Sequence, residues 1–121
     1  MKSPEGTKAG SKKRLLSGIK STGRLHIGNY FGALKQFIDL QDKYETFVFI
    51  ANLHALTGTP TKEQLLEDTN NMILDYLGAG LDPEKVTIFK QSDVPAHANL
   101  AWIFDCLVTV PYLERAHAYK D

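Results

Sequence analysis

The sequence predicts an α/β fold in which a parallel sheet is connected by right-handed βαβ crossovers, and three observations support this prediction. Short apolar runs typical of strands alternate with longer segments whose apolar residues recur at helical spacing. One run, from Thr46 to Leu53, is largely apolar, as in a parallel strand buried on both faces. A turn broken by Gly18 and Gly23 joins the first strand to the first helix. Ligands of such sheets bind beyond the carboxyl ends of the strands.

The first βαβ unit consists of a strand, a helix and a second strand. We expect a strand over Arg14 to Ile19, a helix from Gly28 to about Lys43, and the apolar strand over Thr46 to Leu53. The apolar stripe of this helix is expected to contain Tyr30, Phe31, Leu34, Phe37 and Ile38.

A second unit follows the apolar strand. Its helix is expected to begin near Thr61, because Thr61 and Gln64 have the spacing of a capping box. Gly78, Gly80 and Pro83 mark its end, and Val86 to Phe89 is expected to be the third strand. The buried stripe of the helix is expected to contain Leu65, Leu66, Met72, Ile73, Tyr76 and Leu77.

The last predicted helix runs from about Pro95 to Val110, and Pro111 is expected to break it before a turn through Tyr112 to Glu114. Its apolar residues are interpreted first as core and second as a surface for dimerisation. They surround Cys106, which would then be a buried free thiol. The apolar residues in question are Trp102, Ile103, Phe104, Leu107 and Val108.

Composition limits the possible functions. Lysine plus arginine and aspartate plus glutamate both number 14, so no bulk positive charge is available for non-specific binding of nucleic acid. A single cysteine excludes an internal disulfide, and the histidines and cysteine form no short ligand pair, so we expect no metal site. No apolar run approaches the roughly 20 residues of a membrane span. These features predict a cytoplasmic protein without a membrane partner.

Two regions differ in composition. Residues 1–13 are mostly Gly, Ser, Pro and Lys and contain no apolar signal-peptide core, so we expect a disordered basic tail. Residues 14–121 contain the alternating strands and helices and are long enough to form one domain.

The junction between the first strand and the first helix is suited to phosphate. The first amides of a helix have no partner within it and lie at the positive end of its dipole, and Gly28 allows a ligand to approach the backbone closely. His26 and Asn29 add polar side chains, and Lys20 and Arg24 add positive charge. Alone, each glycine or histidine would more simply serve backbone geometry or face solvent. Together they favour a phosphate site, although neither G-x-G-x-x-G nor the Walker loop is present.

Several motifs give the chain a family resemblance. Thr22 to Asn29 resembles the His-Ile-Gly-His signature of class I aminoacyl-tRNA synthetases, in the His-Ile-Gly-Asn form of the tryptophanyl-tRNA synthetases. Asn52 to Thr57 is similar to the segment that ends the second strand of that family. Gln91 to His97 with Ala101-Trp102, and then Leu113 to Arg115, resemble its third strand end and the following helix. The Ser-Asp-Val-Pro-Ala-His run favours the tryptophanyl branch over the tyrosyl branch.

The resemblance implies the N-terminal part of a Rossmann-like catalytic domain over residues 14–121, and it implies roles for individual residues. His26 and Asn29 would act in catalysis by contacting the ATP phosphates and ribose. The residues expected to bind ATP are Lys20, Thr22, Gly23, His26, Gly28 and Asn29. The residues expected to line the tryptophan pocket are Leu16, Gly18, Ala51 and His54. The chain departs from the family at Lys20-Ser21, where Gln-Pro is usual, and at Asn52, where Asp is usual.

The implied activity is that of a tryptophan–tRNA ligase. The whole enzyme would use ATP and Mg²⁺ to form tryptophanyl-adenylate, transfer the tryptophanyl group to tRNA(Trp), and work as a homodimer. The family's indole-reading residue, its Lys-Met-Ser-Lys-Ser loop and its anticodon domain come from a part that has no counterpart in these 121 residues. We therefore expect this chain alone to bind ATP weakly and to catalyse little aminoacylation. A tyrosyl-type synthetase and a non-catalytic nucleotide-binding module of the same fold are the alternatives.

Overall fold

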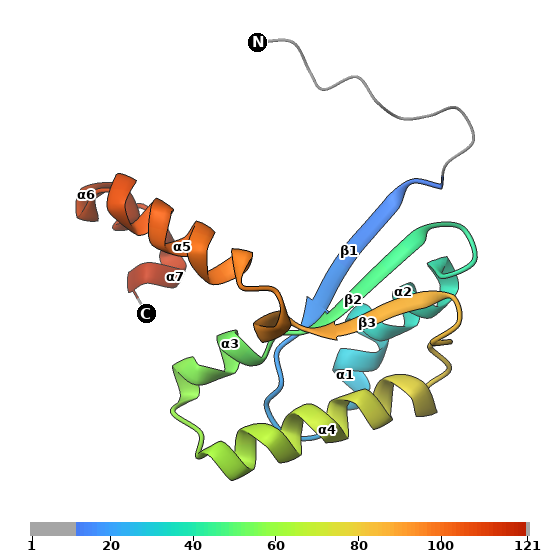
Figure 1. Ribbon diagram of the computed structural model, residues 1–121. Helices are drawn as coiled ribbons and strands as arrows, with labels where there is room; N and C mark the ends of the chain where they lie inside the picture. Colours follow the sequence, from blue (N-terminus) through green and yellow to red (C-terminus); the bar gives the residue numbers. More distant parts are fainter. Residues whose placement is uncertain (1–11, 121) are drawn as a thin grey trace. The chain divides into compact units, whose positions relative to one another are not determined.

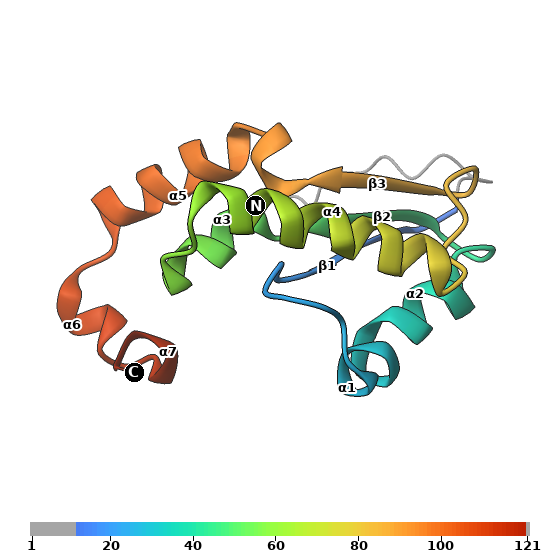
Figure 2. The same ribbon diagram turned by 90° about the horizontal axis from the view of Figure 1, so that it is seen from below.

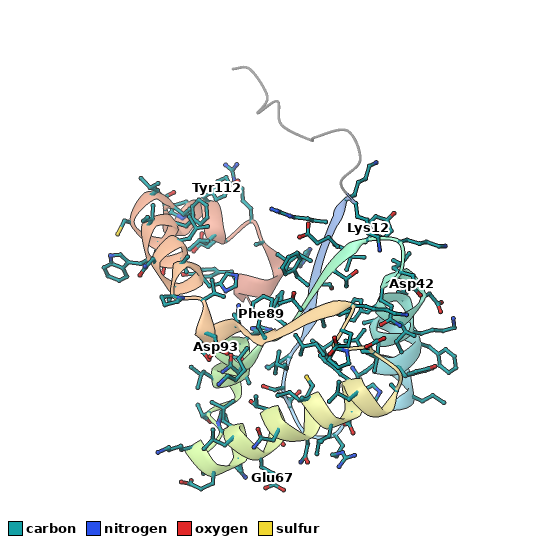
Figure 3. The ribbon with its side chains drawn as sticks, turned by 45° about the vertical axis from the view of Figure 1, so that its right-hand side comes forward. Lys12, Asp42, Glu67, Phe89, Asp93 and Tyr112 are labelled. Carbon is teal, nitrogen blue, oxygen red and sulfur yellow. The ribbon has the colours of Figure 1, made fainter. Side chains whose placement is uncertain are left out.

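The computed structural model describes residues 12–120, apart from the side chains of residues 118 and 120 (Figure 1). The first eleven residues of the predicted basic tail lie outside the described part. Lys12 is held near the start of the sheet, because its ammonium donates to the Asp42 backbone oxygen at 2.7 Å (Figure 3). The chain divides into two units, one up to Gln91 and one from Ser92 onward.

The first unit contains a three-stranded sheet, β1 (Arg14–Ile19), β2 (Glu45–Ile50) and β3 (Val86–Lys90). The order is β1-β2-β3 and both pairings are parallel, which confirms the predicted α/β class.

The prediction for the middle strand was wrong at its end. The ladder stops at Ile50, and α3 (Asn52–Ala55) begins where the strand was expected to continue. Ala51 leaves the extended conformation, with φ −80° and ψ 62°, and its carbonyl accepts the Ala55 amide at 3.2 Å. This bond closes the first turn of α3, so Asn52 and Leu53 are helical.

The first helical segment contains a π-helical turn. It consists of α1 (Ile27–Asn29), the π turn η1 (Tyr30–Leu34) and α2 (Lys35–Leu40). A π turn changes the helical period, and Phe31 in it is 60% exposed rather than part of the predicted buried stripe. The segment also ends before the expected Lys43, because the Lys43 and Tyr44 amides both donate to the Leu40 carbonyl as the chain turns into β2.

The second helix of this unit, α4 (Lys62–Gly78), begins with the predicted capping box. The Gln64 amide donates to the Thr61 hydroxyl at 3.2 Å, and the Thr61 amide donates to the Gln64 side chain at 3.0 Å. The predicted stripe was wrong at Leu66 and Leu77, which are 56% and 39% exposed. Thr69 is buried instead, and its hydroxyl donates to the Leu65 carbonyl.

The core lies on one face of the sheet. Val48 and Ile50, two residues apart on β2, both point into it, so both helices pack on this face. Figure 2 views the sheet with α4 in front of the strands. The prediction that β2 is buried on both faces was wrong, because Phe47 and Phe49 on the opposite face are only half-buried. The buried cluster contains Leu34, Phe37, Val48, Ile50, Met72, Tyr76, Leu81 and Val86.

The second unit is helical. It follows the short turn η3 (Gln91–Asp93) and contains α5 (Ala96–Leu107), α6 (Val110–Leu113) and α7 (His117–Lys120). The helix predicted to reach Val110 ends at Leu107, since Val108 is extended. The turn predicted after Pro111 was also wrong: Pro111 lies in the first turn of α6, where a missing amide is tolerated.

The apolar residues of α5 were predicted to be core, and this was wrong. Trp102 and Leu107 are 70% and 72% exposed, and Cys106 is exposed as well. Within its own unit α5 has no sheet or long helix to bury an apolar stripe against. None of the described helices is long and apolar enough to cross a membrane.

Candidate functional site

The loop after β1 is anchored to α4 at its far end. Gly23 has φ 67°, a left-handed conformation that favours glycine. The Arg24 guanidinium pairs with the Asp75 carboxylate at 2.6 Å, and the Leu25 amide donates to the other oxygen of Asp75 at 3.2 Å. Asp75 therefore fixes the entry to α1 and offsets the charge of Arg24.

The near end of the loop is hydrogen-bonded to the segment that follows β2. The Lys20 ammonium donates to the Thr57 hydroxyl at 3.0 Å, and that hydroxyl donates to the His54 carbonyl at 2.9 Å. Thr57 lies in the turn η2 (Leu56–Gly58), directly after α3. The structure thus brings together Lys20, predicted to bind ATP, and His54, predicted to line the tryptophan pocket. The polar loops of β1 and β2 meet at the carboxyl edge of the sheet, as predicted.

The start of α1 is capped by both residues predicted to act in catalysis. His26 Nδ1 accepts the Gly28 amide at 3.1 Å, and the His26 amide donates to Asn29 Oδ1 at 3.1 Å. Because Nδ1 accepts, the neutral ring carries its proton on Nε2. Asn29 likewise keeps its Nδ2 protons for other partners. The remaining donors of both side chains suit phosphate or ribose oxygens.

Gly28 also has a steric reason to be glycine. A Cβ added at Gly28 would lie 2.9 Å from His26 Cε1, so a side chain there would displace the capping imidazole. The close approach of the His26 ring and the predicted approach of a ligand both require an unsubstituted backbone at this position.

The face of the sheet away from the core carries two of the predicted tryptophan-pocket residues. Leu16 is 62% exposed on this face, and Gly18 lies beside Phe49 in the register. A Cβ at Gly18 would come within 2.4 Å of the Phe49 carbonyl oxygen. Phe49 in turn pairs with Phe89, with ring centroids 5.8 Å apart and planes inclined at 42°. Phe89 is labelled in Figure 3.

Phe49 and Phe89 were not predicted to belong to this surface. Phe49 was missed because the sequence pattern placed both faces of β2 in the core. Alternation along the strand could have found Phe49, since Gly18 and Phe49 are register partners that share a face.

The other two pocket candidates lie at the end of β2. Ala51 is buried, and its amide donates to the Ile19 carbonyl at 2.9 Å, so it adjoins the end of β1. His54 is exposed on α3. The third predicted loop, Gln91 to Pro95, begins at the end of β3, but Ser92 to Pro95 belong to the second unit, and their convergence on this edge stays a prediction.

A cavity of about 530 Å³ lies between the loop after β1 and α4. Ser21, at the position where proline is usual, is 1% exposed, and its hydroxyl has no hydrogen-bond partner among the described residues. A buried hydroxyl without a partner destabilises a loop that a proline would stiffen. The cavity is lined by Ser21, Thr22, Gly23, Arg24, Ala55, Gly58, Thr59, Pro60, Gln64, Glu67, Asp68 and Asn71, and Glu67 is labelled in Figure 3.

No group of three His, Cys, Asp or Glu side chains that could hold a metal ion occurs among residues 12–120. Buried acid–base chemistry is also sparse there. Burial raises the pKa of the Tyr76 hydroxyl, and Tyr76 belongs to the buried core cluster. The segment from the end of β1 to the start of α1 offers the Lys20 ammonium and the N–H donors of His26 and Asn29, and the face of β1 away from the core offers an apolar surface. Such a set binds and orients an anionic, partly aromatic ligand.

Comparisons with known proteins agree with this chemistry. The model of the family described as "tRNA synthetases class I (W and Y)" matches residues 8–121. The chain is 58% identical over 109 residues to a tryptophan–tRNA ligase of Fusobacterium nucleatum, which covers 90% of the chain and 34% of that relative. It is 51% identical to the corresponding ligase of Rhodopirellula baltica, over 89% of the chain and 34% of the relative.

A solved structure is also similar. It is the tryptophanyl-tRNA synthetase of Campylobacter jejuni complexed with ADP and tryptophan, with a TM-score of 0.81 and 44% identity. The match covers 89% of the chain and 34% of that structure. The chain thus spans about a third of the length of the curated relatives that it matches.

Proposed function

Because the chain belongs to the class I tRNA synthetases for tryptophan and tyrosine, we propose that it serves the ATP-dependent activation of tryptophan and its transfer to tRNA(Trp). The observation that carries this proposal is the capped start of α1, where His26 and Asn29 keep N–H donors beside the glycine at position 28. The side-chain donors of His26 and Asn29 and the Lys20 ammonium would together bind the oxygens of a nucleoside triphosphate.

The first reaction joins the tryptophan carboxylate to the α-phosphorus of ATP and releases pyrophosphate. One carboxylate oxygen forms the new bond to phosphorus, and the bond between the α-phosphorus and the bridging oxygen to the β-phosphate breaks. Negative charge grows on the departing pyrophosphate. His26 Nε2–H, Asn29 Nδ2–H and the Lys20 ammonium would donate to these phosphate oxygens, so the protein contributes alignment and charge stabilisation rather than covalent chemistry.

Tryptophan would bind on the face of the sheet away from the core. The indole ring is large, flat and apolar, and it requires an apolar slot with a polar partner for its N–H. Leu16, Gly18, Phe49 and Phe89 offer such a surface, and Ala51 and His54 lie at the carboxyl end of β2. The absence of a side chain at Gly18 keeps the surface low enough for a ring to lie on it.

Further parts of this function rest on the family and on the named relatives. We assign Mg²⁺ to the phosphates of the nucleotide, since the described residues offer no carboxylate cluster for it. The tRNA partner, a homodimeric assembly and a cytoplasmic location belong to the same proposal. A tyrosyl-type enzyme is not favoured, because the relatives with high identity are tryptophan–tRNA ligases.

Calorimetric titration of the 121-residue chain tests this proposal. Mg·ATP should bind weakly, and tryptophan should raise its affinity whereas tyrosine should not. ATP–pyrophosphate exchange by the chain alone should be slight, because the contacts expected from the rest of the family's catalytic domain are not supplied. Equal effects of the two amino acids, or no nucleotide binding at millimolar concentration, would contradict the proposal.

A further inference from the structure

The loop after β1 carries two cations, and the structure distinguishes them. Arg24 is paired at 2.6 Å with Asp75, whose side chain is largely buried, so its charge is already compensated. Lys20 is half-buried and has no carboxylate within ion-pair distance among the described residues. Its one observed partner is the uncharged Thr57 hydroxyl. Of the two cations, Lys20 is therefore the one whose charge is available to an anion.

The Thr57 hydroxyl is oriented by a second bond. It donates its only proton to the His54 carbonyl at 2.9 Å, so the oxygen can meet Lys20 only as an acceptor. The Lys20 ammonium, which approaches at 3.0 Å, must donate one of its three N–H groups there. Two N–H groups of Lys20 remain for another acceptor.

From this geometry we infer that Thr57 is a positioning residue that holds the Lys20 ammonium at the carboxyl edge of the sheet for an anionic phosphate oxygen of the nucleotide. The inference rests on the proposed function, because it names the cation that the site uses and the residue that places it.

Two physical effects make this arrangement suitable for binding. A lysine side chain has four rotatable bonds, and fixing them before the ligand arrives removes part of the entropy lost on binding. An uncharged partner fixes the ammonium without neutralising it, whereas a carboxylate would compete with the phosphate for the same charge. Thr57 fixes the Lys20 side chain and leaves its charge available. Asp75 fixes the Arg24 side chain but neutralises its charge.

Calorimetric titration of Mg·ATP into variants of the whole chain tests the inference. Replacement Lys20→Met should weaken binding about tenfold, since it removes a charge-assisted hydrogen bond. The isosteric replacement Thr57→Val should weaken ATP binding about fivefold. Thr57→Ser, which keeps the hydroxyl, should bind ATP as the unchanged chain does. Arg14→Met, the control, should change ATP binding by less than about twofold, because Arg14 lies at the amino end of β1 in an exposed ion pair with Glu45.

The double variant separates positioning from a merely structural role. If Thr57 acts through Lys20, Thr57→Val should have no further effect in a Lys20→Met chain. A loss of the same size in both backgrounds would overturn the inference. So would wild-type affinity in Thr57→Val, or a larger loss in Arg14→Met than in Lys20→Met.

Side-chain NMR of the lysine ammonium groups tests the tether without nucleotide. The Lys20 signal of the unchanged chain should report a restricted side chain, and Thr57→Val should release it. If the unchanged chain binds no ATP, the proposed function fails and the positioning role falls with it. If it binds ATP but Thr57→Val changes neither the affinity nor the Lys20 signal, only the role of Thr57 is overturned.

Discussion

The two faces of the sheet are built from alternate residues of the same strands, yet they differ in character. On the core face, Val48 and Ile50 are fully buried under α2 and α4. On the opposite face, Leu16 is 62% exposed, and Phe47 and Phe49 are half-buried. The first face holds the unit together, and the second presents a flat apolar surface next to the polar carboxyl edge. We therefore predict that stability and the proposed ligand binding can be changed separately by substitutions only one residue apart.

The largest expected effect is on stability and comes from the core face. Replacement Ile50→Ala should lower the free energy of unfolding by about 3 kcal/mol, because it removes buried methylene groups and leaves a cavity. Phe47→Ala on the other face should lower it by only about 1 kcal/mol, since this ring is only partly buried. Urea denaturation followed by circular dichroism measures both changes. Equal losses would contradict the distinction between the faces.

Gly18→Ala should affect both properties. The added Cβ would lie 2.4 Å from the Phe49 carbonyl oxygen, which is backbone and cannot turn away, so the two strands must shift. We expect about 2 kcal/mol of destabilisation together with weaker tryptophan binding. Gly78→Ala at the end of α4 is the control, since nothing lies within 4 Å of its added Cβ. Unchanged tryptophan binding in Gly18→Ala would remove Gly18 from the pocket.

We also expect the stability of the chain to fall at alkaline pH, because Tyr76 is buried in the core. Burial raises the pKa of Tyr76 in the folded chain, so the folded state holds this proton more tightly than the unfolded state does. Stability from Tyr76 is complete below the unfolded pKa of about 10 and is lost as the pH rises above it, by at most about 1.4 kcal/mol per pH unit. The measurement is thermal unfolding between about pH 9 and pH 11. The decline should be shallower in Tyr76→Phe, and identical slopes would contradict a buried, neutral Tyr76.

The smallest expected effects concern the two capping boxes. His26→Ala and Thr61→Ala should each lower stability by about 1 kcal/mol, because each removes an acceptor from a helix amide. Only His26→Ala should also weaken Mg·ATP binding, since the Thr61 cap lies at the start of α4. Thermal unfolding and calorimetry on the same samples measure the two effects. An equal loss of ATP affinity in Thr61→Ala would show that the effect is not local to α1.

Local sequence patterns predicted much of the fold. The strand over Arg14–Ile19, the capping box at Thr61 and Gln64, and the parallel class are all confirmed, because each depends on residues close together in the chain. The end of β2 was predicted wrongly because an apolar run does not show where the ladder ends. The π turn after Asn29 was missed because the spacing of apolar residues predicts a regular helix and does not show a local change of its period. The exposure of α5 was missed because burial depends on which other elements are present to pack against it.

The site shows the same limit. The sequence suggested that Lys20 and Arg24 both contribute positive charge to the loop. Their partners, Thr57 and Asp75, lie 37 and 51 residues away in the chain, and no local pattern predicts which cation a distant carboxylate compensates. His26 and Asn29 were predicted as ligand contacts, and the structure adds that each also caps the helix.

The central claim is that ligands bind at the carboxyl edge and on the face of the sheet away from the core. Backbone amide NMR of the chain, recorded before and after addition of Mg·ATP and tryptophan, tests it most directly. We predict that the largest shift changes fall at Lys20, Gly28 and Phe49, while amides at the opposite edge of the sheet, such as that of Lys43 just before β2, stay in place. The largest changes around Lys43, or no changes at the carboxyl edge of the sheet, would contradict it.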